Sequence, residues 1–344
     1  MTDYFICKPG QPPIAWIPPE PAQTIDANCA YFGKVFEVME QQLHSKEFTV
    51  YFTWDVNELP SYGPNVVAVV QGDEWCRIPR YAHRVRAVFK CYGTRPILGC
   101  NLLRYPSYLN VLTAVQFLRI LLIRIPGVLH HQWHSFKPFR SPACNRSAIY
   151  DIPLGYYNQS NLPVQPIEQR SCDVFFAGSV IQGDYPIWSL KRYIGTPKNL
   201  SRRQMLECLQ EIELTHPHWK IKLRLTTDFN ASRDSDQTSY SEQMMNAKIC
   251  LVPRGTSFET FRFFEALRYG CIVITEALPD RWFYANAPVI QLENWHELEK
   301  VLSHLLNHPD RLQELHQARL NWWKDYCSEV AVGEYIAEQL NALS

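Results

Sequence analysis

One stretch near the C-terminal end constrains the fold more than any other part of this chain. Lys248 to Pro279 reads KICLVPRGTSFETFRFFEALRYGCIVITEALP. A short apolar run ends at Pro253, a polar loop follows, and an amphipathic segment then ends at Gly270 before a second apolar run. This order predicts strand, loop, helix and strand, which is half of an α/β unit of the nucleotide-binding type.

The helix of this unit is predicted over residues 258–269, with Ser257 as its N-cap. The side chains expected on its core-facing side are Phe261, Phe263, Phe264 and Leu267. Glu259, Arg262 and Glu265 are expected on the opposite side, where a solvated stripe of paired charges is the alternative interpretation. Because the helix start lies at the carboxyl end of a strand, its free N–H groups and dipole favour a diphosphate there.

The succession of strand, PRG, Ser, Arg, FEAL, GCIVI and LP resembles the donor-nucleotide motif of exostosin-family glycosyltransferases, over roughly residues 173–295. The resemblance implies the α/β fold called GT-B, in which two Rossmann-like doubly wound domains face a cleft. It also implies that the nucleotide sugar is held mainly by the C-terminal domain. At matching positions, Arg254, Ser257 and Arg262 would face the diphosphate. Glu265 would accept hydrogen bonds from the ribose hydroxyls, since a carboxylate offers two oxygens to two donors.

Two further pairs of small residues are expected on the donor side. Gly255 and Thr256 belong to the polar loop of the motif. Cys172 to Ala177 is predicted as the first strand of the C-terminal domain, and Gly178 and Ser179 follow it directly. A turn built from such small residues lets a phosphate approach the backbone.

One departure from a related pattern bears on the mechanism. Many retaining enzymes of this architecture carry a second glutamate eight positions before the ribose-binding one, and Ser257 occupies that position here. The resemblance therefore implies an inverting reaction, in which a base on the acceptor side deprotonates the attacking hydroxyl. The strand predicted at Asn65–Val70 runs into a polar loop that carries Asp73 and Glu74, our candidates for this base. A solvated turn is the alternative interpretation of that loop.

Other polar residues of the N-terminal half are weaker candidates. His83 is a second possibility for the base, and Lys90 and Arg95 are cations suited to a phosphate or an acidic sugar. His130 and His134 are four residues apart, but Pro126 and Gly127 are expected to end the preceding helix, and no further ligand is evident. We therefore expect no metal site and no cofactor besides the nucleotide sugar.

A metal-dependent transferase of the other large fold is disfavoured as well, because no Asp-x-Asp follows a predicted strand in the C-terminal half. The Asp234–Asp236 motif lies in a polar turn.

Composition narrows the possible classes of protein further. The 34 basic residues balance the 34 acidic residues, which argues against a dedicated nucleic-acid binder. The 11 cysteines include several inside apolar runs, and the N-terminus lacks the pattern of a signal peptide, so a cytoplasmic protein is expected.

Three parts of the chain are expected. Residues 1–160 would form an acceptor-side Rossmann-like domain, residues 161–325 the domain that binds the nucleotide sugar, and residues 326–344 a helix that packs back on the first domain.

Tyr108–Val128 reads as a long apolar helix interrupted by Arg119 and Arg124. It is too polar to be expected to span a membrane, and we favour a buried inter-domain helix over an interfacial membrane helix. Peripheral contact with the inner face of a membrane stays open.

The predicted function is transfer of a sugar from a nucleotide diphosphate sugar, a UDP-sugar above all, to a saccharide hydroxyl. The reaction would be inverting and metal-independent and would serve the synthesis of a polysaccharide or glycoconjugate. One alternative is a catalytically silent homologue that binds a nucleotide or glycan as a partner or scaffold. A sugar-nucleotide epimerase of the same architecture is a third possibility, and it would act without an acceptor.

Overall fold

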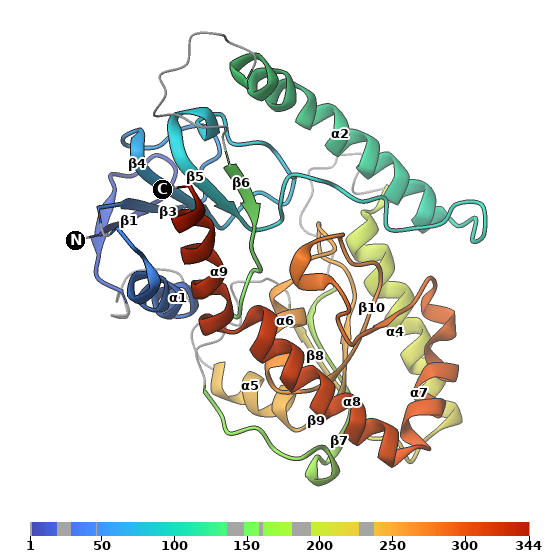
Figure 1. Cartoon of the computed structure of the whole chain (residues 1–344). Coiled ribbons are helices and arrows are strands. Elements are labelled where there is room, and N and C mark those ends of the chain that lie inside the picture. The colour runs from blue at the N-terminus through green and yellow to red at the C-terminus, as the bar shows by residue number, and fades with distance from the viewer. Residues whose placement is uncertain are drawn as a thin grey trace.

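The computed structural model describes residues 2–18, 29–45, 47–135, 148–157, 161–180, 194–226 and 237–343. The described strands form two separate sheets (Figure 1). The Asp234–Asp236 motif and residues 158–160, at the start of the expected domain join, lie outside the described residues.

The N-terminal sheet has the order β2-β1-β3-β4-β5-β6. Its strands are β1 (Asp3–Cys7), β2 (Ile14–Trp16), β3 (Thr49–Thr53), β4 (Gly63–Val70), β5 (Val85–Lys90) and β6 (Ala148–Asp151). All pairs are parallel except β1 with β2. Helix α1 (Cys29–Gln42) covers one face, while the 3₁₀ turn η1 (Ala82–Arg84) and its loop cover the other. Valine runs such as that of β4 suit a strand that is buried on both faces.

The C-terminal sheet is parallel throughout and has the order β11-β10-β9-β7-β8. Its strands are β7 (Cys172–Ser179), β8 (Ile221–Thr226), β9 (Ala247–Val252), β10 (Ile272–Thr275) and β11 (Ile290–Gln291). The chain reverses its direction across the sheet between β7 and β9, and open α/β sheets bind ligands at the carboxyl ends of strands at such a point. The predicted α/β fold, with a parallel sheet in each half, is confirmed.

The helices of the C-terminal half pack on both faces of this sheet. They are α4 (Pro197–Thr215), α5 (Gln237–Met245), α6 (Phe261–Arg268), α7 (Leu298–Leu306) and α8 (Pro309–Trp322), with short 3₁₀ turns at η2 (Ile167–Gln169), η3 (Trp282–Tyr284) and η4 (Trp295–Glu297). Helix α6 begins three residues later than predicted, with Thr260 and not Ser257 in the N-cap position. The Ser257 hydroxyl instead accepts a hydrogen bond from the Glu259 N–H at 3.3 Å, which closes a local turn.

The late start of α6 removes Glu259 from the exposed helix face that the sequence suggested. Glu259 is buried in the loop and pairs with Arg281, their Oε2 and Nη2 atoms lying 2.7 Å apart. Arg281 also contacts Asp151, at the end of β6, at 3.2 Å. This buried triad joins the N-terminal sheet to the donor loop, because each of its three members comes from a different segment.

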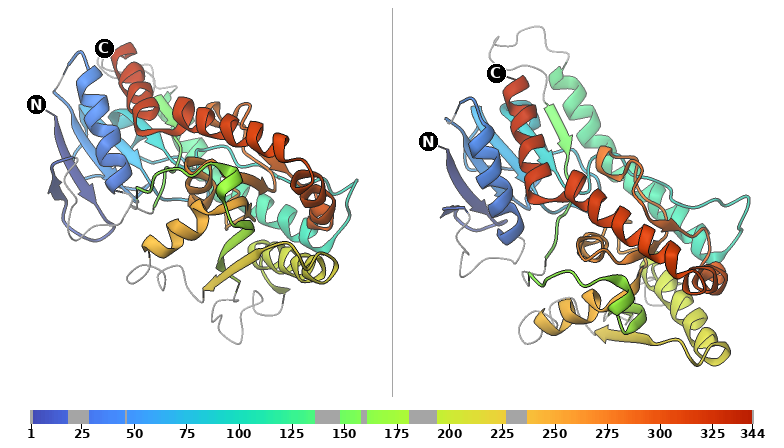
Figure 2. Two further views of the ribbon diagram at one scale, coloured as in Figure 1. Left: turned by 90° about the horizontal axis from the view of Figure 1, so that it is seen from below. Right: turned by 60° about the horizontal axis from the view of Figure 1, so that its bottom comes forward.

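The end of the described chain returns to the N-terminal half. After α8, a π-helical turn, η5 (Trp323–Cys327), leads into α9 (Glu329–Ala342), which packs along α1 (Figure 2). The Tyr31 hydroxyl donates to the Cys327 carbonyl at 2.7 Å, and the Tyr156 hydroxyl donates to Glu329 at 2.6 Å. At Gly333 the two helices approach closely, since a Cβ there would lie 2.7 Å from the Val35 carbonyl oxygen.

Helix α2 (Tyr108–Ser135) crosses from the C-terminal half to the N-terminal half along one side of the molecule (Figure 1). The expected stop at Pro126 is wrong, because the helix continues through this residue. Pro126 lies on the exposed side, where water can satisfy the carbonyl that loses its partner. The expectation of a buried helix is also wrong: only 11% of its most apolar stretch is buried, and by length and composition alone it could cross a membrane.

Candidate active site

The donor loop, which we define as residues 253–260, follows β9 at the reversal point of the C-terminal sheet. Arg254 is buried at its start, with its guanidinium 4.1 Å from the centre of the Phe258 ring. The same guanidinium donates to the Thr113 hydroxyl at 3.0 Å and to the side-chain amide oxygen of Gln116 at 3.2 Å. Gln116 also donates to the backbone carbonyl of Thr256 at 2.9 Å. Helix α2 therefore lies against the donor loop.

The end of β7 and the first turn of α6 meet. Gly178 and Ser179 are the last two residues of β7, so the prediction that they form a turn after the strand is wrong. A Cβ on Gly178 would lie 2.7 Å from the Arg262 Nη2 atom, so the guanidinium lies this close to the strand end because Gly178 has no side chain. Arg262 also lies over the Phe176 ring at 5.3 Å. Its buried Nε atom has no hydrogen-bond partner in the described structure. A cation therefore borders the carboxyl end of β7, where a phosphate could approach the backbone.

Glu265 is buried on α6, and its two oxygens point to different donors. The Tyr157 N–H donates to Oε1 at 3.1 Å, and the Tyr240 hydroxyl donates to Oε2 at 2.8 Å. Each carboxylate oxygen has a second acceptor position. These two hydrogen bonds therefore hold the carboxylate in one orientation.

The sequence interpretation missed two cations at the start of α4. Arg202 is buried, donates to the Ser179 carbonyl at 2.6 Å and lies 3.3 Å from the Arg254 carbonyl oxygen. Burial and the charge of Arg262 lower the Arg202 pKa to about 9. Lys198 precedes it in the first turn. Thr196 followed by proline was an available signal for a helix start, since Thr196 caps α4.

Asp73 and Glu74 lie in very different surroundings. The Asp73 side chain is inaccessible to solvent, and its carboxylate accepts from Arg77 at 2.7 Å and lies 3.2 Å from the Lys90 amine. Lys90 is itself fully buried, so it is not placed to meet a phosphate. Asp73 also has a positive φ of 83°. This carboxylate belongs to an internal ion-pair network that holds the loop, and it is not placed for proton transfer.

Glu74 instead faces the C-terminal half. Its carboxylate borders the same hollow as Thr256 of the donor loop, and Thr256, Lys198 and Arg202 all act to lower its pKa. Burial raises the Glu74 pKa above its ordinary value, although Thr256 and the two cations act in the opposite direction. Arg95 borders the same hollow as Glu74, together with Ser257 and Arg281. A partly desolvated carboxylate of the N-terminal half thus lies in the cleft between the two halves, beside the donor loop.

His83 is not at this cleft, and the alternative that made it a base is wrong on geometry. Its ring lies with those of His130 and His134, near the far end of α2. Burial, together with these two neighbouring imidazoles, lowers the His83 pKa to about 4.

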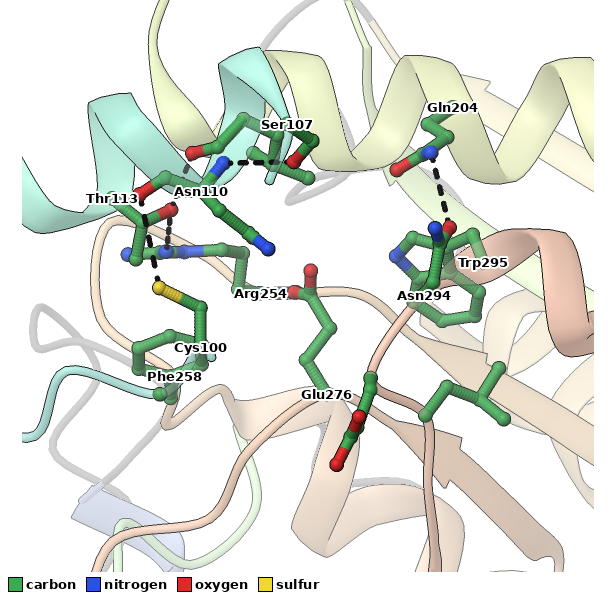
Figure 3. A pocket seen from close by; sticks show the side chains of 14 residues that line it. Cys100, Ser107, Asn110, Thr113, Gln204, Arg254, Phe258, Glu276, Asn294 and Trp295 are labelled. Carbon is green, nitrogen blue, oxygen red and sulfur yellow. Dashed lines mark hydrogen bonds between the residues drawn. The ribbon is translucent and has the colours of Figure 1, made fainter. Parts of the chain in front are cut away.

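A second hollow lies on the other side of Arg254, between the start of α2 and the loop after β11 (Figure 3). Glu276, which follows β10, projects into it. Its Oε1 atom accepts from the Ser201 hydroxyl at 2.8 Å and its Oε2 atom from the Arg254 N–H at 2.9 Å. The sequence interpretation passed over Glu276, although its place after a strand of the motif was a usable signal. Gly255 lies in the donor loop, where a Cβ would be 3.4 Å from the Ser257 carbonyl oxygen.

Comparison with known proteins finds similar sequences over part of the chain. Residues 190–333 match the model of the RXYLT1 C-terminal domain. Exostosin-1 of Bos taurus is 30% identical over 116 residues, which are 30% of this chain and 15% of that protein. Ribitol-5-phosphate xylosyltransferase 1 of Danio rerio is 27% identical over 183 residues, which are 48% of this chain and 39% of that protein. The matched region is thus well under two thirds of the length of either relative.

Among solved structures, WaaG, a glycosyltransferase involved in lipopolysaccharide biosynthesis, aligns with a TM-score of 0.44 at 12% identity. The alignment covers 92% of this chain and 96% of WaaG. The resemblance to exostosins read from the motif is confirmed by the sequence relatives.

Proposed function

We propose that this chain is a glycosyltransferase, because its C-terminal region is similar in sequence to the RXYLT1 C-terminal domain and to exostosin-1. Its donor is a nucleotide diphosphate sugar, with UDP-sugars the first to test, and its acceptor is a saccharide hydroxyl. The reaction is inverting and needs no metal ion. It serves the synthesis of a polysaccharide or glycoconjugate in the cytoplasm.

The observation that carries this proposal is the position of Glu74. It comes from the N-terminal half, borders the same hollow as Thr256 of the donor loop and has a raised pKa. A general base needs a lone pair of electrons near the attacking hydroxyl and a pKa close to the working pH. Burial raises the pKa of the Glu74 carboxyl toward that range. The Asp73 carboxylate instead forms ion pairs with Lys90 and Arg77.

The chemistry follows from these two sides of the cleft. Glu74 takes the proton of the acceptor hydroxyl as the oxygen forms a bond to the anomeric carbon. The bond from that carbon to the phosphate oxygen breaks, and its electron pair leaves with the nucleotide diphosphate. Arg262 lies against Gly178 at the end of β7, and Arg202 donates to the Ser179 carbonyl beside it, so two cations border the place where we expect this negative charge to develop.

Arg254 joins them after a change of partner. Its guanidinium now donates to a hydroxyl and an amide oxygen of α2, and a phosphate would form stronger charge-assisted bonds in their place. Ser257 in the position of the second glutamate supports the inverting course.

Donor binding is tested by thermal shift and titration with UDP, GDP, ADP and CMP and their common sugar conjugates. We expect one nucleotide diphosphate to stabilise the wild type selectively, and Arg262→Ala and Arg202→Ala to weaken its binding. Arg203→Ala is the matched control, because Arg203 is exposed on the same helix and pairs with Glu207. Lack of stabilisation by every nucleotide would contradict the proposal.

The base is tested separately from the donor site. We expect Glu74→Gln to lower the transfer rate about 10²- to 10⁴-fold while donor affinity stays nearly unchanged. Glu58→Gln, an exposed carboxylate of the same half, is the control and keeps full activity. Donor binding without transfer by the wild type to any saccharide would favour the silent homologue, and interconversion of donors without an acceptor would favour an epimerase.

We propose in addition that α2 rests on the surface of a membrane. Large apolar side chains recur every three or four residues along its exposed side, at Tyr108, Val111, Val115, Leu118, Leu122, Ile125, Leu129 and Trp133. The helix contains no acidic residue, and its charged side chains are Arg119 and Arg124. An apolar stripe with arginines beside it complements an anionic lipid surface.

Vesicle flotation tests this contact. We expect the wild type to float with vesicles that contain phosphatidylglycerol, and Leu118→Glu with Leu122→Glu to abolish flotation. Leu214→Glu is the control, because Leu214 is also an exposed leucine but lies on α4, far along the sequence from the stripe. Equal flotation of all three proteins would contradict the role of α2.

A further inference from the structure

Three histidines converge where the C-terminal end of α2 meets η1. The ring centres of His83 and His134 are 3.9 Å apart and nearly parallel, those of His130 and His134 are 4.4 Å apart, and those of His83 and His130 are 5.2 Å apart. Their ligand nitrogens all lie within 4.8 Å of one another. Within the described part of the chain, the group consists of these three residues.

The fold explains why they meet. Because α2 continues through Pro126, His130 and His134 lie one turn apart on the same side of the helix. The backbone of α2 can approach the loop before η1 at Gly127, where a Cβ would lie 3.4 Å from the Ile78 Cβ and carbonyl oxygen.

His83 is held from its own side. The turn η1 closes through hydrogen bonds from Ala82 to Pro79 and from Arg84 to Tyr81. The His83 ring also hydrogen-bonds to the backbone of Arg80, and metal-binding histidines use such bonds to fix the orientation of the ring. The neighbouring Arg84 guanidinium is stacked 3.4 Å from the centre of the Tyr62 ring.

We propose that His83, His130 and His134 bind one divalent transition-metal ion of the zinc class. Three imidazoles with an open fourth position for water are an established donor set for Zn²⁺. Nitrogens bound at about 2.1 Å in a tetrahedron lie about 3.4 Å apart. Rotation of the side chains can bring the ligand nitrogens from their present separations of up to 4.8 Å to this value. The exposed His130 side chain has the most room to rotate. Imidazole does not suit Mg²⁺ or Ca²⁺.

The ion has a structural role in this proposal and stays separate from sugar transfer. The residues that line the hollow around Glu74 do not include the three histidines. The ion fixes the C-terminal half of α2 to the N-terminal half of the molecule, while Thr113 and Gln116 fix its other half to the donor loop.

Equilibrium dialysis against Zn²⁺ at pH 7.5, followed by metal analysis, tests the site on the full chain. We expect one zinc per chain in the wild type, and at least a tenfold weaker affinity in His83→Ala, His130→Ala and His134→Ala. Zinc should also raise the melting temperature of the wild type alone. His304→Ala is the matched control, because His304 and His308 are four residues apart with ring centres at 4.7 Å but form no group of three with any other described residue.

Circular dichroism in EDTA establishes that each variant is folded. His130→Ala is the variant that least endangers folding, since that side chain is exposed. Wild type without stoichiometric zinc, or undiminished zinc binding in His130→Ala or in His83→Ala, would overturn the proposal. An equal loss in His304→Ala would overturn it as well.

Discussion

Two adjacent carboxylates show how strongly the environment decides what a residue can do. Asp73 and Glu74 share a loop, yet Asp73 accepts from Arg77 and Lys90 inside the N-terminal half, while Glu74 lies in the cleft beside the donor loop. The sequence could place both at the end of a strand. It could not separate them, because the separation depends on a positive φ at Asp73 that turns successive side chains to different sides.

The pH dependence of transfer should reveal Glu74. A base acts when it is ionised, and burial raises the Glu74 pKa, so kcat/KM should fall as the pH drops through that raised value. The acidic limb of the profile is therefore expected above the ordinary glutamate value of 4.5. The residual activity of Glu74→Gln should lack this limb. A limb that persists in the variant would assign the base to another group.

Gly178→Ala should impair donor binding without unfolding the protein. The added Cβ would meet the end of the flexible Arg262 side chain at 2.7 Å, and that side chain can move aside. Loss of a hydrogen bond to a charged group predicts about 10- to 100-fold weaker donor binding. Titration of the single and double variants with Arg262→Ala checks this. Additive losses would mean that Gly178 acts independently of Arg262.

At the scale of elements, the strands of the C-terminal half were predictable because their apolar runs are bounded by polar turns. Two helices were not. The helix α6 begins late because Glu259 finds a buried partner in Arg281, which lies outside any local pattern. The helix α2 continues past Pro126 because the affected carbonyl faces water, a fact of the assembled molecule. Because of these two errors, the sequence could not predict which side chains meet, for example His83 with His130 and His134.

The buried triad of Glu259, Asp151 and Arg281 should be indispensable for joining the two sheets. Removal of Arg281 leaves two carboxylates buried or half-buried without their cation, so Arg281→Met should lower the free energy of unfolding by about 3–5 kcal/mol. Urea unfolding measures this. Arg311→Met removes an exposed pair with Glu314 and should cost about 0–1 kcal/mol. Similar losses in both variants would contradict the special role of the triad.

At the scale of the whole molecule, α9 closes the structure by packing on α1. Gly333→Ala tests how tight this contact is. Alanine favours an isolated helix by about 1 kcal/mol over glycine, but here its Cβ would lie 2.7 Å from the Val35 carbonyl oxygen. We expect a net destabilisation of about 1–3 kcal/mol in thermal or urea unfolding. A stabilised variant would show that the helices can separate freely.

The sequence could supply the donor loop and the residues of its motif because they are close together in the chain. Arg202, Glu276 and the contact of α2 with Arg254 come from distant segments, and only the assembled fold brings them to the same edge of the sheet. The local pattern therefore predicts which chemistry is present. The surroundings of each group depend on the tertiary structure.

The packing of α9 on α1 also determines how long α1 waits for its partner while the chain is being synthesised. The hydrogen bond from Tyr31 to Cys327 joins residues 296 positions apart. At about 5–20 residues per second, a ribosome needs about 15–60 s to make the intervening chain. During that time the apolar side of α1 that later receives α9 has no partner from its own molecule. The growing chain thus depends on a chaperone, or on fast folding of the remaining surface, for much of a minute.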